Sequence, residues 1–128
     1  MGLLVKKETI EIQVCYEEKD GRLAFFEEGK PRPSEAKTET FIFRKPNWGD
    51  IRKIMSSAAK TSPDGQTITI DFYAMADARV KQLLESWSIK GDNGEALPPT
   101  AENVDGLAPN LVQYVIKLLA DKIPPLEQ

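Results

Sequence analysis

Alternating apolar and polar residues predict three β-strands in the first 45 residues. The first covers residues 4–17, where one side of the strand carries Glu8, Ile10, Ile12, Val14 and Tyr16. A period of two with β-branched residues is typical of a half-buried strand. Asp20-Gly21 is a favoured hairpin pair, so residues 23–27 are expected to return as a second strand. Residues 38–44 alternate again and predict a third strand, which Pro46 ends.

Apolar residues spaced by three and four predict three helices, over residues 47–60, 69–89 and 109–123. Asn47 and Asp50 form a capping-box pattern at the start of the first helix. The second helix has one apolar stripe, formed by Phe72, Ala76, Val80, Leu83, Leu84 and Trp87. Its other side carries Asp77, Lys81 and Glu85 at four-residue steps, the spacing of surface ion pairs. The order of elements therefore changes from strands to helices near residue 46.

Strands followed by helices favour an α+β fold, with a three-stranded antiparallel N-terminal sheet and a three-helix C-terminal part packed on it. A length of 128 residues is typical of a single domain, here residues 1–128. Residues 1–45 form its sheet part and include a loop, 29–36, that we expect to be mobile because it contains Pro31 and Pro33. Residues 46–123 form the helical part, and residues 124–128 form a tail that begins with two prolines.

Composition narrows the possible chemistry. The chain has no histidine, which removes the commonest general base and the commonest zinc ligand. Asp92-Asn93-Gly94 is followed by Leu97 and prolines rather than by the oxygen ligands of a calcium loop. The acidic residues allow many carboxylate pairs, but no pattern selects one of them. We therefore expect no catalytic residue, no metal and no cofactor, and a protein that is not an enzyme.

Charge and cysteine content indicate the compartment. The net charge is −3 and the basic residues are scattered, which argues against nucleic-acid binding. No apolar run approaches the roughly 18 residues of a membrane span. A single cysteine, Cys15, cannot form an internal disulfide and is expected to be a small surface residue on the polar side of its strand. These features predict a cytoplasmic protein.

Residues 87–107 form a joint between the second and third helices. Trp87 closes the apolar stripe, and a Gly-Asp-Asn-Gly turn follows it. Thr100 is expected to cap a short turn over residues 101–104, while Leu97 and Leu107 fold the segment back onto Trp87. Trp48, at the start of the first helix, is expected to be a core anchor, with a partner contact as the alternative. The joint is thus structural rather than chemical.

Between residues 41 and 107, three sequence motifs occur in a specific order and spacing. They are Phe41-Ile42-Phe43-Arg44-Lys45-Pro46-Asn47-Trp48-Gly49-Asp50, then Leu83-Leu84-Glu85-Ser86-Trp87-Ser88-Ile89, then Asp92-Asn93-Gly94-Glu95-Ala96-Leu97-Pro98-Pro99-Thr100-Ala101-Glu102-Asn103-Val104 with Leu107. In this order the chain resembles the tail assembly chaperones of long-tailed bacteriophages. The resemblance runs from about Thr40 to Ile123, about two thirds of the chain.

The resemblance implies a non-enzymatic assembly factor of the host cytoplasm. Such proteins coat the aggregation-prone tape measure protein and recruit tail tube subunits, and self-association suits that task. The N-terminal hairpin, residues 4–28, and the loop after it lie outside the resemblance. That leaves open a small structural tail component retained in the virion, such as a tube, completion or baseplate-associated protein.

A chaperone of this kind needs an exposed apolar face for its partner. The third helix has an apolar arc wider than one stripe, and the residues of that arc proposed for partner binding are Val112, Ile116, Leu119 and Ile123. The alternative is that this helix is simply the packed end of the core. Phe25 and Phe26 are the second candidate, because neighbouring residues of a strand point to opposite faces and one of the two could be exposed.

Overall fold

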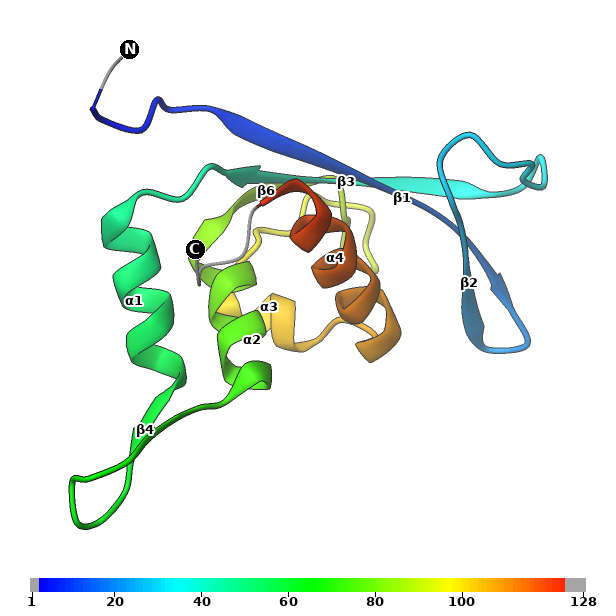
Figure 1. Cartoon of the computed structure of the whole chain (residues 1–128). Coiled ribbons are helices and arrows are strands. Elements are labelled where there is room, and N and C mark those ends of the chain that lie inside the picture. Colours follow the sequence, from blue (N-terminus) through cyan, green and yellow to red (C-terminus); the bar gives the residue numbers. More distant parts are fainter. Residues whose placement is uncertain (1–2, 124–128) are drawn as a thin grey trace.

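The computed structural model describes residues 3–123 of the chain, and these form an α+β fold. Four antiparallel strands make the main sheet in the order β2-β1-β3-β6. They are β1 (Thr9–Lys19), β2 (Arg22–Phe26), β3 (Lys37–Arg44) and β6 (Leu84–Trp87). The helices lie on one side of this sheet (Figure 1): α1 (Trp48–Ala58), α2 (Phe72–Leu83), α3 (Ala101–Asp105) and α4 (Pro109–Lys122).

The core fills the space between the sheet and the helices. The alternation predicted for β1 is confirmed, since Ile12 and Val14 are buried while Glu11 and Gln13 are exposed. Strand and helix residues meet in one cluster, whose buried side chains are Ile12, Val14, Phe41, Phe43, Ile54, Val80, Leu83, Val104, Val115, Leu119 and Ile123. The prediction of an α+β fold is therefore correct.

The prediction for residues 84–87 is wrong, because they form a fourth strand instead of the end of a long helix. α2 ends at Leu83, and Leu84 has extended backbone angles, φ −68° and ψ 121°. β6 then pairs with β3, with Trp87 opposite Phe41. Apolar residues at positions 83, 84 and 87 fit a helical stripe, yet the free edge of β3 satisfies their backbone groups in a ladder. Tertiary pairing thus overrides the local helical pattern.

The connection between α1 and α2 contains two short strands that the sequence did not predict. β4 (Ala59–Thr61) and β5 (Ile68–Ile70) form a two-stranded hairpin that projects beyond the ends of both helices (Figure 1). The Asp71 N–H donates to the carbonyl oxygen of Ala58, 2.9 Å away, so the end of α1 lies beside the start of α2. The first helix itself is confirmed within two residues at each end.

Two side chains have an exposure opposite to the predicted one. Trp48 was expected in the core but is 73% exposed. The buried side of α1 carries Asp50, Ile54 and Ala58 at four-residue steps, and Trp48 lies on a different side of the helix. Cys15 was expected at the surface but is only 7% exposed. It has strand partners on both sides, and the closeness of its sulfur to the Arg32 guanidinium raises the pKa of Arg32.

The remaining expectations concern the loop, the tail and the membrane. Residues 27–36 connect β2 to β3 without a regular element, and the mobility of loop 29–36 stays a prediction. The tail of residues 124–128 lies outside the described residues. Within residues 3–123, no helix combines the length and the apolar character that crossing a bilayer requires.

Replacing Trp87 by Phe should destabilise the protein by about 1–2 kcal/mol. The indole N–H of Trp87 donates to the carbonyl oxygen of Leu97 at 2.5 Å, and its ring meets Phe41 edge-on at 6.1 Å. Phenylalanine keeps an aromatic contact and leaves the carbonyl unpaired. Urea denaturation followed by circular dichroism measures the loss. The matched control is Trp48→Phe, which should change stability by less than about 0.5 kcal/mol. Equal losses in both variants would contradict the prediction.

Candidate functional site

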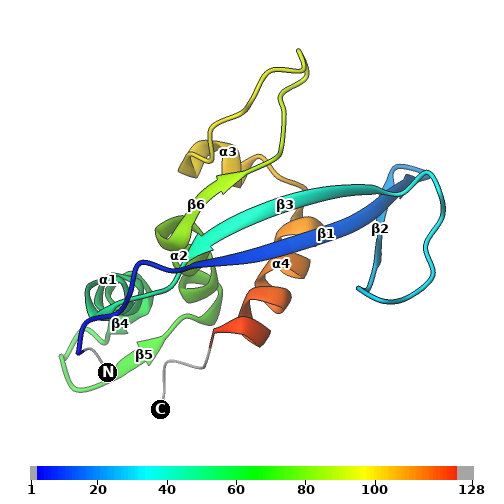
Figure 2. The ribbon, with the colours of Figure 1, turned by 90° about the horizontal axis from the view of Figure 1, so that it is seen from above.

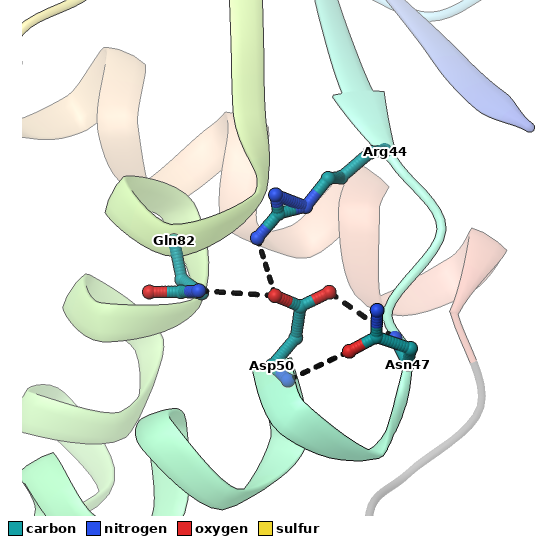
Figure 3. Close-up of polar contacts among 4 residues, drawn as sticks. All are labelled: Arg44, Asn47, Asp50 and Gln82. Carbon is teal, nitrogen blue, oxygen red and sulfur yellow. Dashed lines mark hydrogen bonds and ion pairs between the residues drawn. The ribbon is translucent and has the colours of Figure 1, made fainter. Parts of the chain in front are cut away.

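A polar junction joins the end of β3 to the start of α1 and the last turn of α2 (Figure 3). Asp50 is its centre, and Arg44, Asn47 and Gln82 surround it. The capping box is confirmed: the Asp50 N–H donates to Asn47 Oδ1 at 2.9 Å, and the Asn47 N–H donates to Asp50 Oδ2 at 3.1 Å. Gln82 Nε2 of α2 donates to Asp50 Oδ1 at 3.0 Å, and Arg44 forms an ion pair with the same oxygen. The junction therefore connects β3, α1 and α2.

Asp50 stays ionised in this environment. Asp50 is only 5% exposed, and this burial acts to raise the pKa of its carboxyl group. Hydrogen bonds from Gln82 and from the Asn47 backbone, together with the charge of Arg44, outweigh desolvation and lower the pKa below its usual value. A carboxylate with a lowered pKa and both oxygens engaged is a poor proton donor or acceptor near neutral pH. The junction is suited to holding elements together rather than to acid–base chemistry.

A cavity of about 400 Å³ lies beside the junction. Its walls carry both cationic and anionic side chains, and its lining is Val5, Lys6, Lys7, Glu8, Thr9, Arg44, Lys45, Asn47, Asp50 and Glu85. Lys45 approaches Glu8 to 3.8 Å, so these opposite charges partly offset each other. Within residues 3–123, no three acidic or cysteine side chains are grouped closely enough to hold a metal ion. The cavity has no arrangement that selects one ligand chemistry.

The joint between β6 and α4 has the predicted cap. Thr100 Oγ1 accepts a hydrogen bond from the Asn103 N–H at 3.2 Å, and α3 starts there. Trp87 reaches Leu97 through its indole N–H, as expected for a segment that folds back. Leu97 and Leu107 are half-buried, and a direct contact of Leu107 with Trp87 stays a prediction. Sequence reasoning missed Asn103, whose Nδ2 also donates to the Pro98 carbonyl oxygen at 2.8 Å.

The ion pairs of α2 differ from the predicted row. Lys81 forms the expected pair with Asp77, at 3.1 Å. Its second partner is Asp105 at the end of α3, 2.7 Å away, rather than Glu85. Glu85 belongs to β6, so the four-residue helical spacing does not extend to it. Lys81 thereby ties α3 to α2, a contact with no signal in the local sequence.

The structure places the proposed contact residues of α4 mainly in the core. Leu119 and Ile123 are 0% and 3% exposed, so an exposed partner face that includes them is wrong. Val112 and Ile116 are half-buried. The physical reason is that α4 packs against the sheet, where its wide apolar arc meets both β1 and the other helices. Leu119 and Ile123 therefore fit the alternative interpretation, in which this helix is the packed end of the core.

Phe25 and Phe26 are both half-buried. Phe25 stacks on Tyr114 of α4, with ring centroids 4.5 Å apart and ring planes 6° from parallel. Asn110 Nδ2, one turn earlier in α4, donates to the Leu23 carbonyl oxygen at 3.4 Å. Phe25 therefore attaches the N-terminal hairpin to α4. Phe26 lies opposite Cys15 in the β1–β2 ladder and keeps a partly open surface.

Large apolar side chains are exposed at the hairpin end of the α1–α2 pair. Phe72 and Tyr73, in the first turn of α2, are 70% and 88% exposed. Ile68 of β5 is 68% exposed, and Met55, in the last turn of α1, is 36% exposed. The Ala58–Asp71 hydrogen bond brings this end of α1 to the start of α2. We call Met55, Ile68, Phe72 and Tyr73 the hairpin-end surface.

Sequence reasoning missed this surface because Phe72 fits the apolar stripe of the predicted helix. The signal that could have found it is Asp71, a good N-cap residue. Its Oδ1 accepts hydrogen bonds from the N–H groups of Tyr73 and Ala74, at 3.0 and 3.1 Å. A helix that starts after Asp71 has Phe72 and Tyr73 in its first turn. The two aromatic residues are then beside the exposed hairpin instead of under the sheet.

A groove of about 310 Å³ lies between α1 and α2. Small residues and charged residues share its walls, and the lining is Lys53, Ile54, Ser57, Ala74, Asp77, Ala78, Lys81 and Gln82. Ala74, which lines the groove, directly follows Tyr73 in the sequence, so the groove starts within one helical turn of Tyr73 along α2. Ser57, Ala74 and Ala78 have short side chains and keep the groove open. The groove and the hairpin-end surface are the two parts of the candidate site.

Comparisons with known proteins give no match for this chain, whether with protein-family models, with curated proteins or with solved structures. The basis for a function is therefore the order of the sequence motifs together with the surfaces described above.

Replacing Asp50 by Asn should destabilise the protein by about 2–3 kcal/mol, because the half-buried Arg44 would lose its counter-ion and Asn47 and Gln82 would lose a charged acceptor. The partial exposure of Arg44 keeps the loss below that of a fully buried pair. Urea denaturation measures it. Asp77→Asn is the matched control, since Asp77 is exposed and its loss should cost less than about 0.5 kcal/mol. Similar losses would contradict a special role of Asp50.

The contribution of Asp50 should depend on pH in one direction. Because folding lowers its pKa, the stabilisation is complete above the ordinary aspartate pKa of about 3.9 and is lost as the pH falls through the lower pKa of the folded state. The stability difference between wild type and Asp50→Asn should be constant from about pH 7 to pH 5 and shrink below about pH 4. A pH series of urea denaturation curves measures it. A difference that grows with acidification has the wrong sign.

Proposed function

We propose that this protein is a non-enzymatic tail assembly chaperone of a long-tailed bacteriophage, which binds the tape measure protein and helps recruit tail tube subunits. The support from sequence is the ordered set of motifs between Thr40 and Ile123. A binding function also agrees with the character of the polar junction, where Asp50 is fully engaged in structural contacts. The single observation that supports the proposal most is the exposed hairpin-end surface.

The hairpin-end surface has the properties of a site for an amphipathic helix. Exposed aromatic residues give large contact areas, and they frequently supply most of the binding free energy of an interface. Phe72 and Tyr73 are such residues, and each keeps more than two thirds of its surface exposed. A partner helix uses apolar side chains at spacings of three and four residues to fill a neighbouring groove. The groove between α1 and α2 lies along the same two helices as the hairpin-end surface.

The charges beside the groove favour a partner helix with polar residues flanking its apolar stripe. Lys53 lines the wall formed by α1, while Asp77 and Lys81 line the wall formed by α2. Charges of both signs at the rim of an apolar contact set orientation and discourage wrong partners. A tape measure protein is long and helical, so it presents many such stripes. One small chaperone can therefore bind at many places along it.

One observation favours the structural alternative. The β1–β2 hairpin and the loop after it lie outside the family resemblance, and sheet edges are a common means of joining subunits. A small tail component retained in the virion would use them. Mass spectrometry of purified particles separates the two functions, because a chaperone leaves before the tail is complete. Stoichiometric presence in the particle supports the structural component.

Co-expression with the tape measure protein of the same genome should keep that protein soluble and allow the two to co-purify. The double variant Phe72→Ser and Tyr73→Ser should reduce the co-purified amount by at least about tenfold, because it removes two aromatic contacts. Its own stability should change little, since both side chains are exposed. The measurement is affinity capture from co-expressing cells, with circular dichroism as the folding check.

Trp48→Ser is the matched control for this experiment. Trp48 is also a strongly exposed aromatic residue, but it lies at the other end of α1. This variant should retain binding to the tape measure protein. If wild type fails to co-purify with the tape measure protein and leaves it insoluble, the chaperone function is wrong. If both variants bind like wild type, the function stands and the hairpin-end surface is the wrong site.

A further inference from the structure

β1 is longer than its partner on one side of the sheet. It pairs with β3 from Thr9 to Tyr16, but with β2 only from Cys15 to Lys19. Along residues 9–14 the edge opposite β3 therefore has no strand partner among residues 3–123. Figure 2 shows β2 beside the distal end of β1 only. An internal strand of the sheet thus becomes an edge strand over half of its length.

The hydrogen-bond pattern shows which backbone groups point outward from this edge. The Lys45 N–H donates to the Glu8 carbonyl oxygen at 2.9 Å, so the C=O group of Glu8 points toward β3. In an antiparallel ladder the direction alternates along the strand. The N–H and C=O groups of Thr9, Glu11 and Gln13 consequently point away from β3, and the side chains of the three residues are exposed. Unpaired edges of this kind are templates for another strand.

The side chains along the edge are complementary to a second copy of the same strand. Lys7, Thr9 and Glu11 follow at steps of two, with a positive charge, a neutral hydroxyl and a negative charge. In an antiparallel pair of two copies centred on Thr9, each Lys7 lies opposite Glu11 of the other copy and the two Thr9 residues face each other. Opposite charges and paired threonines are favourable across antiparallel strands. Registers centred on Glu11 would place like charges together.

We propose that this protein forms a two-fold dimer through the free edge of β1, with Thr9 of one copy opposite Thr9 of the other. The turn in which the Glu8 N–H donates to the Lys6 carbonyl oxygen, at 2.8 Å, opens as Lys7 joins the ladder. Two four-stranded sheets then join into one continuous sheet of eight strands. The interface is isologous, as expected for a symmetric dimer. It does not depend on the proposed chaperone function, because no other protein takes part.

Analytical ultracentrifugation of the full chain over a concentration series tests the proposal. Wild type should sediment as a reversible dimer. Glu11→Lys should weaken dimerisation by at least about tenfold, because it places Lys7 opposite a second positive charge. Lys7→Glu should do the same, and the double variant Lys7→Glu with Glu11→Lys should restore most of the loss. A wild type that remains monomeric, or a dimer insensitive to these charge changes, would overturn the proposal.

A proline variant and an engineered disulfide test the edge and the register. Thr9→Pro removes an outward N–H at the first residue of β1, a position where proline is tolerated, and should abolish the dimer without unfolding the chain. In a Cys15→Ala background, Thr9→Cys should form a disulfide-linked dimer, because hydrogen-bonded partners have Cα atoms about 5.5 Å apart. Gln13→Cys is the matched control and should not cross-link. Cross-linking only through Gln13→Cys would contradict this register.

Discussion

The fold depends on one partly desolvated charge, the carboxylate of Asp50. Burial of an ion is costly, and here the cost is offset only when β3, α1 and α2 all supply their partners. Asn47 closes the start of α1, Gln82 reaches across from α2, and Arg44 comes from the end of β3. An alternative packing of the helices would leave the charge without at least one of these groups. The junction thus selects one orientation of the α1–α2 pair on the sheet, and with it the position of the groove.

Local chemistry made part of this fold predictable. The hairpin turn at Asp20-Gly21, the capping box at Asn47 and the cap at Thr100 each involve residues within a few positions of one another, so their signals are present in the sequence. The fourth strand is different. Leu84 to Trp87 have apolar residues at helical spacing, and only the unpaired edge of β3, some forty positions earlier in the sequence, turns them into a strand. Such non-local pairing has no periodicity that a single sequence displays.

The candidate site was less predictable than the fold, because exposure of an apolar residue is a property of the whole structure. Leu119 and Ile123 belong to the core because α4 lies under β1, whereas Phe72 and Tyr73 remain open because α2 begins at Asp71 beyond the edge of the sheet. Helical periodicity predicts which side of a helix is apolar. It does not predict how far the elements that pack on that side extend along the helix. Trp48 is the clearest case: its spacing fits an apolar face, yet its side chain in the first turn of α1 is mostly exposed.

The two proposed surfaces would have different roles in an assembly. A two-fold pairing of β1 edges is closed, so it yields a dimer and not a filament. Each dimer would carry two hairpin-end surfaces, and a long partner with repeated apolar stripes could occupy both. Binding of the second surface then becomes intramolecular, which raises the overall affinity without any new contact. A weak single site of a few aromatic residues would in this way suffice for the dimer to bind a long helix. Loss of one of the two contacts would return the partner to the weak affinity of a single site and allow its release.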